Sequence, residues 1–222
     1  MNLTPQKLTV YTSAVLIVLI VGIIVYVQVF QGQPTTTAPS GELVLDDQPA
    51  IGDPNAPAKI AVFEDFKCPA CRTFEENVMP RVMRNFVDTG QAQVYFVNFQ
   101  FLAPDSITAG IASECAYAQS ETAFWDYKTY IYRSQGPQSQ TWATPERLTQ
   151  IAREFVPELD ADELQTCIEE RRYEDAVLAD RELGERVGVT GTPSVYVNGE
   201  KLESGVYELI DQAVSRAVAQ SQ

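Results

Sequence analysis

Cys68-Pro69-Ala70-Cys71 places two cysteines between a predicted strand and a predicted helix. The run Lys59–Phe63 is apolar enough for a buried strand, and Arg72–Val87 has the pattern of a helix. Cys68 then lies near the N-cap, and Pro69 takes the first helical position, where proline is favoured. A thiol at that point faces unpaired backbone N–H groups and the positive end of the helix dipole, and both favour the thiolate. The stretch therefore predicts redox chemistry.

The remaining pattern predicts an α/β domain. Pro80 is expected to kink the helix after the cysteines, because proline cannot donate a helical hydrogen bond. Gln93–Phe101 predicts a second strand that completes a βαβ unit. Helical patterns then fill about residues 103–188, and Asn198-Gly199 predicts a hairpin turn before a final helix over Tyr207–Val218. The order β-α-β, helical insert, β-β-α is typical of helices packed on a mixed sheet.

The N-terminal segment is predicted to cross a membrane. Residues 8–27 carry no charge and consist mainly of aliphatic side chains, over a length that spans a bilayer. Lys7 precedes this run and no Lys or Arg follows before Lys59, which places the N-terminus in the cytoplasm. A cleaved signal peptide is the alternative, but the run is long for one and no A-x-A site follows closely. We expect a cytoplasmic segment over 1–7, a transmembrane signal-anchor helix over 8–30, a flexible linker over 31–41 and a catalytic domain over 42–219.

Composition excludes several classes of function. The formal net charge of −14 disfavours nucleic-acid binding, which needs a basic face. The chain has no histidine, so Ser-His-Asp and Cys-His catalysis are excluded, as are copper sites built on cysteine and histidine. Four cysteines in an extracytoplasmic domain indicate disulfides rather than metal ligands. We expect no metal, and thiol–disulfide exchange needs no bound cofactor.

At four places the chain resembles the DsbA-like thiol–disulfide oxidoreductases of the thioredoxin superfamily. A lone CxxC is a weak signal, but a CxxC after a strand, with G-T-P-S-V-Y-V-N-G far downstream, is a strong one. The resemblance covers nearly all of residues 42–219. The four matching stretches are Gly52-Asp53-Pro54-Asn55-Ala56-Pro57 before the first strand, Phe63–Cys71 at the strand and turn, Ala118–Trp125 in the insert, and Gly188–Gly199, which looks like the family's cis-proline loop and the hairpin after it.

The resemblance implies a thioredoxin fold with a helical insertion, at about residues 103–188, between its βαβ and ββα halves. It implies that Cys68 is the attacking cysteine and Cys71 the resolving one. It also implies a cis Thr192–Pro193 bond beside them, where an extended substrate peptide can pair with the backbone. Thr192, together with the dipeptide Pro69-Ala70, would then tune the reduction potential.

The motif departs from the best-known DsbA proteins in the dipeptide between its cysteines. Pro-Ala includes no histidine, and alanine donates nothing to a thiolate. We therefore expect a milder oxidant than those proteins. Lys67 and Arg72 flank the motif, and both are expected to be exposed, solvated charges.

A second departure concerns the acid that related proteins bury beneath the motif. The position six residues before Cys68 is Val62, and the nearest acids are Glu64 and Asp65. Either carboxyl group could relay the proton of Cys71, or both could be surface carboxylates. These alternatives stay open at this point.

The other two cysteines, Cys115 and Cys167, fall on the apolar faces of two predicted insert helices. They could be free buried thiols that act as small apolar side chains, or join the CxxC pair around zinc. We favour a structural disulfide between them. Some DsbA-like proteins resemble this chain in carrying a second cysteine pair in the insert. Such a bond would stabilise the fold by about 2–4 kcal/mol.

The sequence thus predicts a single-pass membrane enzyme of the prokaryotic cell envelope, with its catalytic domain outside the cytoplasm. We expect it to oxidise reduced or unfolded extracytoplasmic proteins and to be reoxidised by a membrane redox partner. One alternative is a reductase or isomerase of the same fold. The other is a non-catalytic, tethered domain of chaperone-like type that binds peptides beside Pro193.

Overall fold

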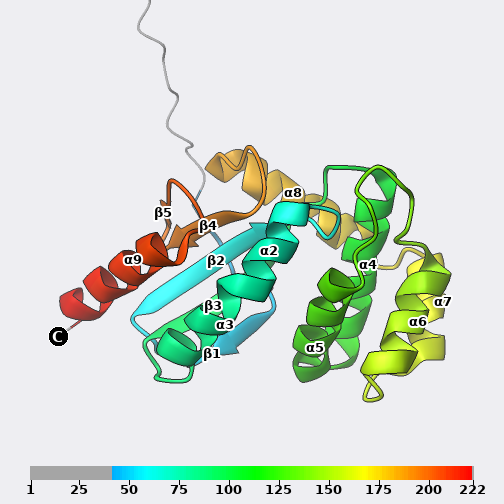
Figure 1. Ribbon diagram of the computed structural model, residues 1–222, viewed down its shortest axis with the longest axis horizontal. Coiled ribbons are helices and arrows are strands. Elements are labelled where there is room, and N and C mark those ends of the chain that lie inside the picture. The colour runs from blue at the N-terminus through cyan, green and yellow to red at the C-terminus, as the bar shows by residue number, and fades with distance from the viewer. Residues whose placement is uncertain (1–41, 222) are drawn as a thin grey trace, which may run out of the picture. The chain divides into compact units, whose positions relative to one another are not determined.

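The computed structural model describes residues 42–221, which form a mixed five-stranded sheet with helices on both faces and a helical insert (Figure 1). The predicted cytoplasmic segment over 1–7, membrane helix over 8–30 and linker over 31–41 lie outside these residues. Within residues 42–221, no helix combines the length and the apolar composition that crossing a bilayer requires.

After a short first strand, the elements follow the predicted order of a βαβ unit, a helical insert and a ββα unit. In chain order they are β1 (Ala50–Gly52), β2 (Ala58–Glu64), α2 (Pro69–Asn77), α3 (Met79–Val82), the π-helical turn η1 (Met83–Val87), β3 (Ala92–Asn98), α4 (Pro104–Gln119), α5 (Glu121–Arg133), α6 (Pro145–Phe155), α7 (Ala161–Glu169), α8 (Glu174–Val187), β4 (Ser194–Val197), β5 (Glu200–Lys201) and α9 (Tyr207–Gln220).

Strand β2 lies at the centre of the sheet, whose order is β1-β3-β2-β4-β5. It pairs in parallel with β3 and antiparallel with β4, so that Val62 lies opposite Phe96 on one side and Val195 on the other. The two outer pairs, β1 with β3 and β4 with β5, are antiparallel. A parallel pair needs a crossover connection, and the segment from α2 to η1 supplies it. The structure therefore confirms the mixed sheet that the sequence predicts.

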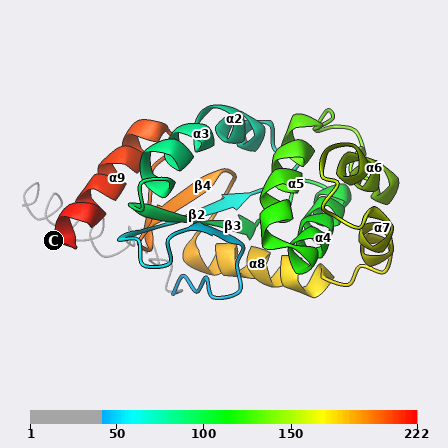
Figure 2. The ribbon, with the colours of Figure 1, turned by 90° about the horizontal axis from the view of Figure 1, so that it is seen from below.

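The two faces of the sheet are covered by different helices (Figure 2). Ile60 and Val62 of β2 pack in one cluster with side chains of α2, α3, η1 and α9. Ala61 and Phe63 point to the opposite face, where they pack with side chains of α8. Gly184 lets α8 approach closely, because a Cβ atom at this position would lie 2.4 Å from the ring of Phe99. The core of the sheet is thus closed on both sides.

One local prediction was wrong, and one short strand was not predicted. The single kinked helix expected over Arg72–Val87 is three segments, since α2 ends at Asn77 and η1 is a π-helical turn. Pro80 occupies the second position of α3, where its missing N–H would have no helical partner. The three-residue strand β1 was not predicted, because such a short segment at a sheet edge carries no periodic pattern.

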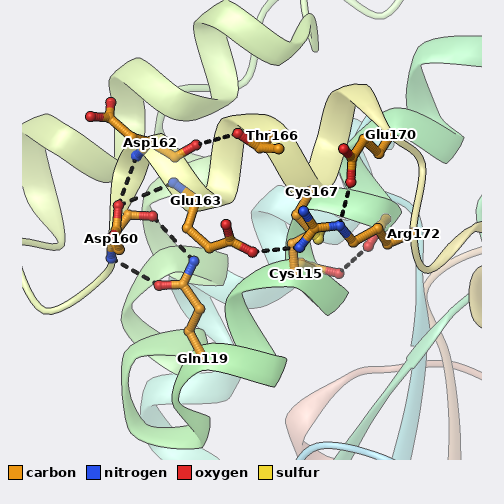
Figure 3. Close-up of a disulfide and its surroundings, with 11 residues drawn as sticks. Cys115, Gln119, Asp160, Asp162, Glu163, Thr166, Cys167, Glu170 and Arg172 are labelled. Carbon is orange, nitrogen blue, oxygen red and sulfur yellow. Dashed lines mark hydrogen bonds and ion pairs between the residues drawn. A yellow bond between two sulfur atoms is a disulfide. The ribbon is translucent and has the colours of Figure 1, made fainter.

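A disulfide joins α4 to α7 inside the insert (Figure 3). The bond links Cys115 to Cys167, whose side chains are almost fully buried. Beside it, Gln119 of α4 accepts a hydrogen bond from the backbone N–H of Asp160 at 2.8 Å and donates one to its carbonyl oxygen at 3.1 Å. Asp160 in turn caps the N-terminus of α7. The disulfide and this amide pair therefore hold the same two helices together.

We expect the Cys115→Ala/Cys167→Ala variant to be about 4 kcal/mol less stable than the parent protein. The bond closes a loop over a sequence separation of 52 residues, and its loss returns that entropy to the unfolded chain. Urea unfolding followed by tryptophan fluorescence measures the change. A Cys68→Ala/Cys71→Ala variant, which also loses two cysteines, is the matched control and should lose far less. Equal stability of the parent protein and the Cys115→Ala/Cys167→Ala variant would contradict the prediction.

Candidate active site

The turn between β2 and α2 is held by the side chain of Asp65. One carboxylate oxygen accepts hydrogen bonds from the backbone N–H of Lys67 at 2.8 Å and from the hydroxyl of Ser106 at 2.9 Å. The other accepts from the N–H groups of Phe101 and Leu102, at 2.9 and 3.0 Å. Asp65 is fully buried, and these four donors satisfy a carboxylate that would otherwise be costly to bury. The turn is thereby tied to the loop after β3 and to the start of α4.

Lys67, which was expected to be exposed, is buried with only 2% of its surface accessible. Its ammonium lies 2.6 Å from a carboxylate oxygen of Asp105 in α4 and donates to the carbonyl of Gln140 at 2.9 Å. The other oxygen of Asp105 accepts from the backbone N–H groups of Trp142 and Ala143. The residue before Cys68 therefore ties the loop between α5 and α6 to the redox turn.

Gln135, in the same loop, contacts the redox turn directly. Its side-chain amide donates to the carbonyl oxygens of Phe66 at 2.7 Å and Cys68 at 3.1 Å. No sequence signal identifies this residue, because its partners lie 67 and 69 positions away. Gln135 thus satisfies two carbonyl groups at the start of α2 from within the helical insert.

The two cysteines of the motif occupy very different environments. Cys68 is the N-cap of α2 and Pro69 is the first helical residue, as predicted. Cys71 lies in the first turn of the helix and has no exposed surface. A hydrogen bond with the Cys71 thiol lowers the pKa of Cys68 to about 6, although partial burial opposes this shift. Burial, followed by the hydrogen bond with Cys68 and the charge of Glu64, raises the pKa of Cys71 far above its usual range. Cys68 is thus the thiolate and Cys71 the protonated thiol.

The loop before β4 lies against Cys68, although it is more than a hundred residues away in the chain. The Cys68 sulfur is 3.4 Å from the backbone oxygen of Thr192, and the Thr192–Pro193 peptide bond is cis. The hydroxyl of Thr192 is buried and has no hydrogen-bond partner in the described part of the chain. On the other side of Cys68, Pro69 and Ala70 are exposed. Cys68 therefore lies between an exposed dipeptide and the backbone of the cis-proline loop.

Glu64, the last residue of β2, lies beneath the motif and is completely buried. Both of its carboxyl oxygens lack a hydrogen-bond partner among residues 42–221. Burial, and then the nearby charge of Glu75, raise the pKa of Glu64 well above its usual value. The environment of Glu64 therefore favours its protonated form.

The structure brings together most of the residues that the sequence marked for the site, namely Glu64, Asp65, Cys68, Pro69, Ala70, Cys71, Thr192 and Pro193. Cys115 and Cys167 lie elsewhere, between α4 and α7. Sequence reasoning missed Gln135, Glu75 and the roles of Lys67 and Asp105, since each acts through a contact distant in sequence. The arrangement can form and exchange a disulfide, because a thiolate lies beside a protonated thiol and a buried acid.

Comparison with known proteins supports this description. The family model described as thioredoxin matches residues 45–216. The probable disulfide bond formation protein D of Bacillus anthracis is 35% identical over 169 residues, which are 76% of this chain and 77% of that protein. The crystal structure of oxidised BdbD from Bacillus subtilis has a TM-score of 0.77 at 26% identity, covering 81% of this chain and 97% of that one. That of Chlamydia trachomatis DsbA has a TM-score of 0.73 at 28% identity, covering 85% and 98%.

We expect iodoacetamide to label Cys68 of the reduced protein at a rate that rises with a midpoint near pH 6, while Cys71 stays unlabelled up to about pH 9. Peptide mass spectrometry assigns the labelled residue at each pH. In a Cys71→Ala variant the hydrogen bond to Cys68 is absent, so the midpoint should rise toward the ordinary value of about 8.5. A midpoint near 8.5 in the parent protein, or labelling of both cysteines, would refute the assignment.

Proposed function

Because this chain belongs to the thioredoxin family and is one of its DsbA-like thiol–disulfide oxidoreductases, we propose that its Cys68–Cys71 pair donates a disulfide to reduced proteins outside the cytoplasm. The observation that carries the proposal is the contrast between the two thiols. Cys68 has a pKa of about 6 at the start of α2, whereas Cys71 is buried and stays protonated. Such a pair favours its reduced form, and a stable reduced form makes the disulfide a good oxidant.

The reaction begins with the oxidised pair. A substrate thiolate attacks the Cys68 sulfur, a mixed disulfide forms between substrate and Cys68, and the bond to Cys71 breaks. A second substrate thiolate then attacks the substrate sulfur of the mixed disulfide, and Cys68 leaves as a thiolate. The substrate has lost two electrons and the pair has gained them. The low pKa of Cys68 makes it a good leaving group in the second step.

The leaving Cys71 must be protonated in the first step, since a buried thiolate is costly. Glu64 is the proposed acid for this transfer, because it is completely buried, its raised pKa favours the protonated carboxyl group, and it lies near enough to Cys71 for its ionised form to raise the pKa of that thiol. Asp65 is a poor candidate, since both of its carboxyl oxygens are already engaged by four donors that hold the turn. Its role in the proposal is to hold the turn.

A substrate peptide would lie in an extended conformation against Thr192 and Pro193, next to the exposed Pro69-Ala70 dipeptide. The backbone at Thr192 is already within 3.4 Å of the Cys68 sulfur, so a strand paired there would bring its own cysteine close to Cys68. Backbone pairing selects for unfolded or extended segments rather than for one sequence. Reduced and unfolded proteins are therefore the substrate class.

The proposed place of action is supported by the sequence of the segment before the domain. The uncharged run over residues 8–27, preceded by Lys7, supports a single-pass anchor with the catalytic domain outside the cytoplasm. Named relatives of the chain are disulfide bond formation proteins, which is consistent with work in an oxidising compartment. A membrane redox partner would reoxidise the pair after each turnover.

We expect a reduction potential between those of thioredoxin, about −270 mV, and DsbA, about −120 mV, since the pKa of Cys68 also lies between theirs. Equilibration in glutathione buffers, with mass spectrometry to assign each cysteine, measures it. The potential should fall by about 59 mV per pH unit below pH 6 and by about 30 mV above it, as one proton fewer accompanies two electrons. A Cys68→Ser variant should not oxidise a reduced test protein. A potential at or below that of thioredoxin would instead favour the reductase alternative.

We expect Glu64→Gln to slow mixed-disulfide formation by about 100-fold at pH 7, because the amide cannot donate a proton to Cys71 as an acid does. Stopped-flow mixing of the oxidised protein with a single-cysteine peptide measures the rate. The rate divided by the thiolate fraction of the peptide should fall in the parent protein as pH rises through the raised pKa of Glu64, and this fall should be absent in the variant. Asp65→Asn is the comparison, and we expect it to lower the stability of the fold instead. An unchanged pH profile in Glu64→Gln would remove Glu64 from the mechanism.

A further inference from the structure

Three ionisable side chains from three elements meet in the core beside the redox pair. They are Glu64 of β2, Glu75 of α2 and Lys128 of α5, and their side chains are 0%, 9% and 3% exposed. The ammonium of Lys128 lies 2.7 Å from a carboxyl oxygen of Glu75 and 3.5 Å from one of Glu64. Lys128 belongs to the helical insert, whereas the other two belong to the thioredoxin half of the domain. A buried cation of the insert thus contacts the acid beneath the cysteines.

The charges in this cluster do not balance if both carboxyl groups are ionised. One ammonium can neutralise one carboxylate, and Lys128 lies closer to Glu75 than to Glu64. An unpaired carboxylate in the core costs more free energy than a protonated one. The cluster is therefore neutral when one carboxyl group carries a proton, and Glu64, the more distant of the two from Lys128, is the one whose surroundings favour the protonated form.

The surroundings keep Lys128 charged. Burial opposes its charge, but the charges of Glu75 and Glu64 outweigh this effect and raise its pKa. The ammonium also lies 5.2 Å from the ring centroids of both Phe96 and Trp125, within reach of cation–π attraction. Lys128 is therefore a fixed positive charge over the pH range in which Glu64 titrates.

The outer side of the cluster meets a cavity of about 330 Å³ between α3 and α5. Glu75 and Lys128 line it, and the exposed residues Asp126 and Arg133 stand at its rim. Glu64 does not line this cavity and is completely buried. Glu75 is thus the carboxyl group that can exchange a proton with water and pass it inward.

The remaining titratable groups that face Glu64 are Cys71 of α2, Asp65 of the same turn and Tyr132 of α5. Burial, and then the charge of Glu64, raise the pKa of Tyr132 well above its usual value, so the phenol stays neutral. The carboxyl oxygens of Asp65 are engaged by four donors outside this cluster. Glu75 and Lys128 are therefore the two charged groups that can move the titration of Glu64 in opposite directions.

We propose that Glu75 and Lys128 are positioning residues for thiol–disulfide exchange, which set the pH at which Glu64 releases its proton to Cys71 and restore that proton from the cavity between α3 and α5. The inference rests on the proposed function of the Cys68–Cys71 pair. When the bond to Cys71 breaks, the Glu64 proton moves to the Cys71 sulfur and both carboxyl groups are briefly ionised. Lys128 stabilises this state, and a proton from water then reaches Glu64 through Glu75. The helical insert therefore takes part in the redox step.

The test compares Lys128→Met with Glu75→Gln in the full-length chain. The rate at which the oxidised protein forms a mixed disulfide with a single-cysteine peptide is measured from pH 5 to pH 9 and divided by the thiolate fraction of the peptide at each pH. Without the cation, Glu64 holds its proton more tightly, so the fall in rate should move to higher pH in Lys128→Met. Without the competing carboxylate, Lys128 pairs with Glu64, so the fall should move to lower pH in Glu75→Gln. We expect each shift to be one pH unit or more, which is a tenfold change in the protonation ratio of Glu64.

Two controls separate electrostatics from folding. Lys128→Arg keeps the charge and should restore the parent profile, and Glu76→Gln changes an exposed neighbour of Glu75 and should leave the profile unchanged. A loss of structure would slow the reaction at every pH rather than shift profiles in opposite directions. If Lys128→Met fails to fold, the isosteric Glu75→Gln decides alone.

Unchanged profiles in both variants, or shifts in the same direction, would overturn the inference. If Glu64→Gln abolishes the pH dependence while these variants leave it unchanged, only the inference fails and the function of the Cys68–Cys71 pair stands. If Cys68→Ser retains oxidase activity, the proposed function itself fails. The two failures are therefore distinguishable.

Discussion

The geometry of the redox pair depends on the buried carboxylate of Asp65. A carboxylate in the core is stable only when hydrogen bonds replace its water, and Asp65 recruits four donors from three segments. Those donors tie the turn before α2 to the loop after β3 and to the first turn of the insert. Lys67, next to the motif, extends the same arrangement to the loop between α5 and α6 through Asp105. The position of Cys68 is thus a property of the whole domain.

Much of the fold could be predicted because its signals are local. A strand, a CxxC and a helix follow one another directly, Asn198-Gly199 forms the tight turn after β4, and Thr144 and Asp160 cap α6 and α7 with their own side chains. The break after Asn77 was not predicted, because Pro80 is compatible both with a kink in one long helix and with the start of a new helix. The strand β1 was not predicted because three residues show no period.

The site was predictable only where the motif itself carries it. The cysteines and the Thr192–Pro193 loop could be marked from the sequence, since the resemblance includes both. Whether Glu64 was a surface or a buried carboxyl group could not be decided, because burial depends on α2 and α5 packing over the end of β2. Lys67 was assigned to the surface for the same reason, since its partner Asp105 lies 38 residues away. Charge pairs distant in sequence leave no periodic trace.

The helical insert and the thioredoxin half are joined through the redox centre. Cys68, Cys71 and Phe66 pack in the same hydrophobic cluster as side chains of α4, α5 and α7. Gln135 and Lys128 reach from the insert to the turn and to the acid beneath it. The disulfide between Cys115 and Cys167 stiffens the helical insert within the same cluster.

The same disulfide also affects how the protein matures. A thiol–disulfide oxidoreductase with a structural disulfide must itself be oxidised during folding, so a newly made copy with four free thiols is a substrate for disulfide formation before it is a catalyst. Once Cys115 and Cys167 are buried in the folded domain, external thiols cannot reach their disulfide. Each copy of the protein therefore needs this bond to be formed only once, during folding.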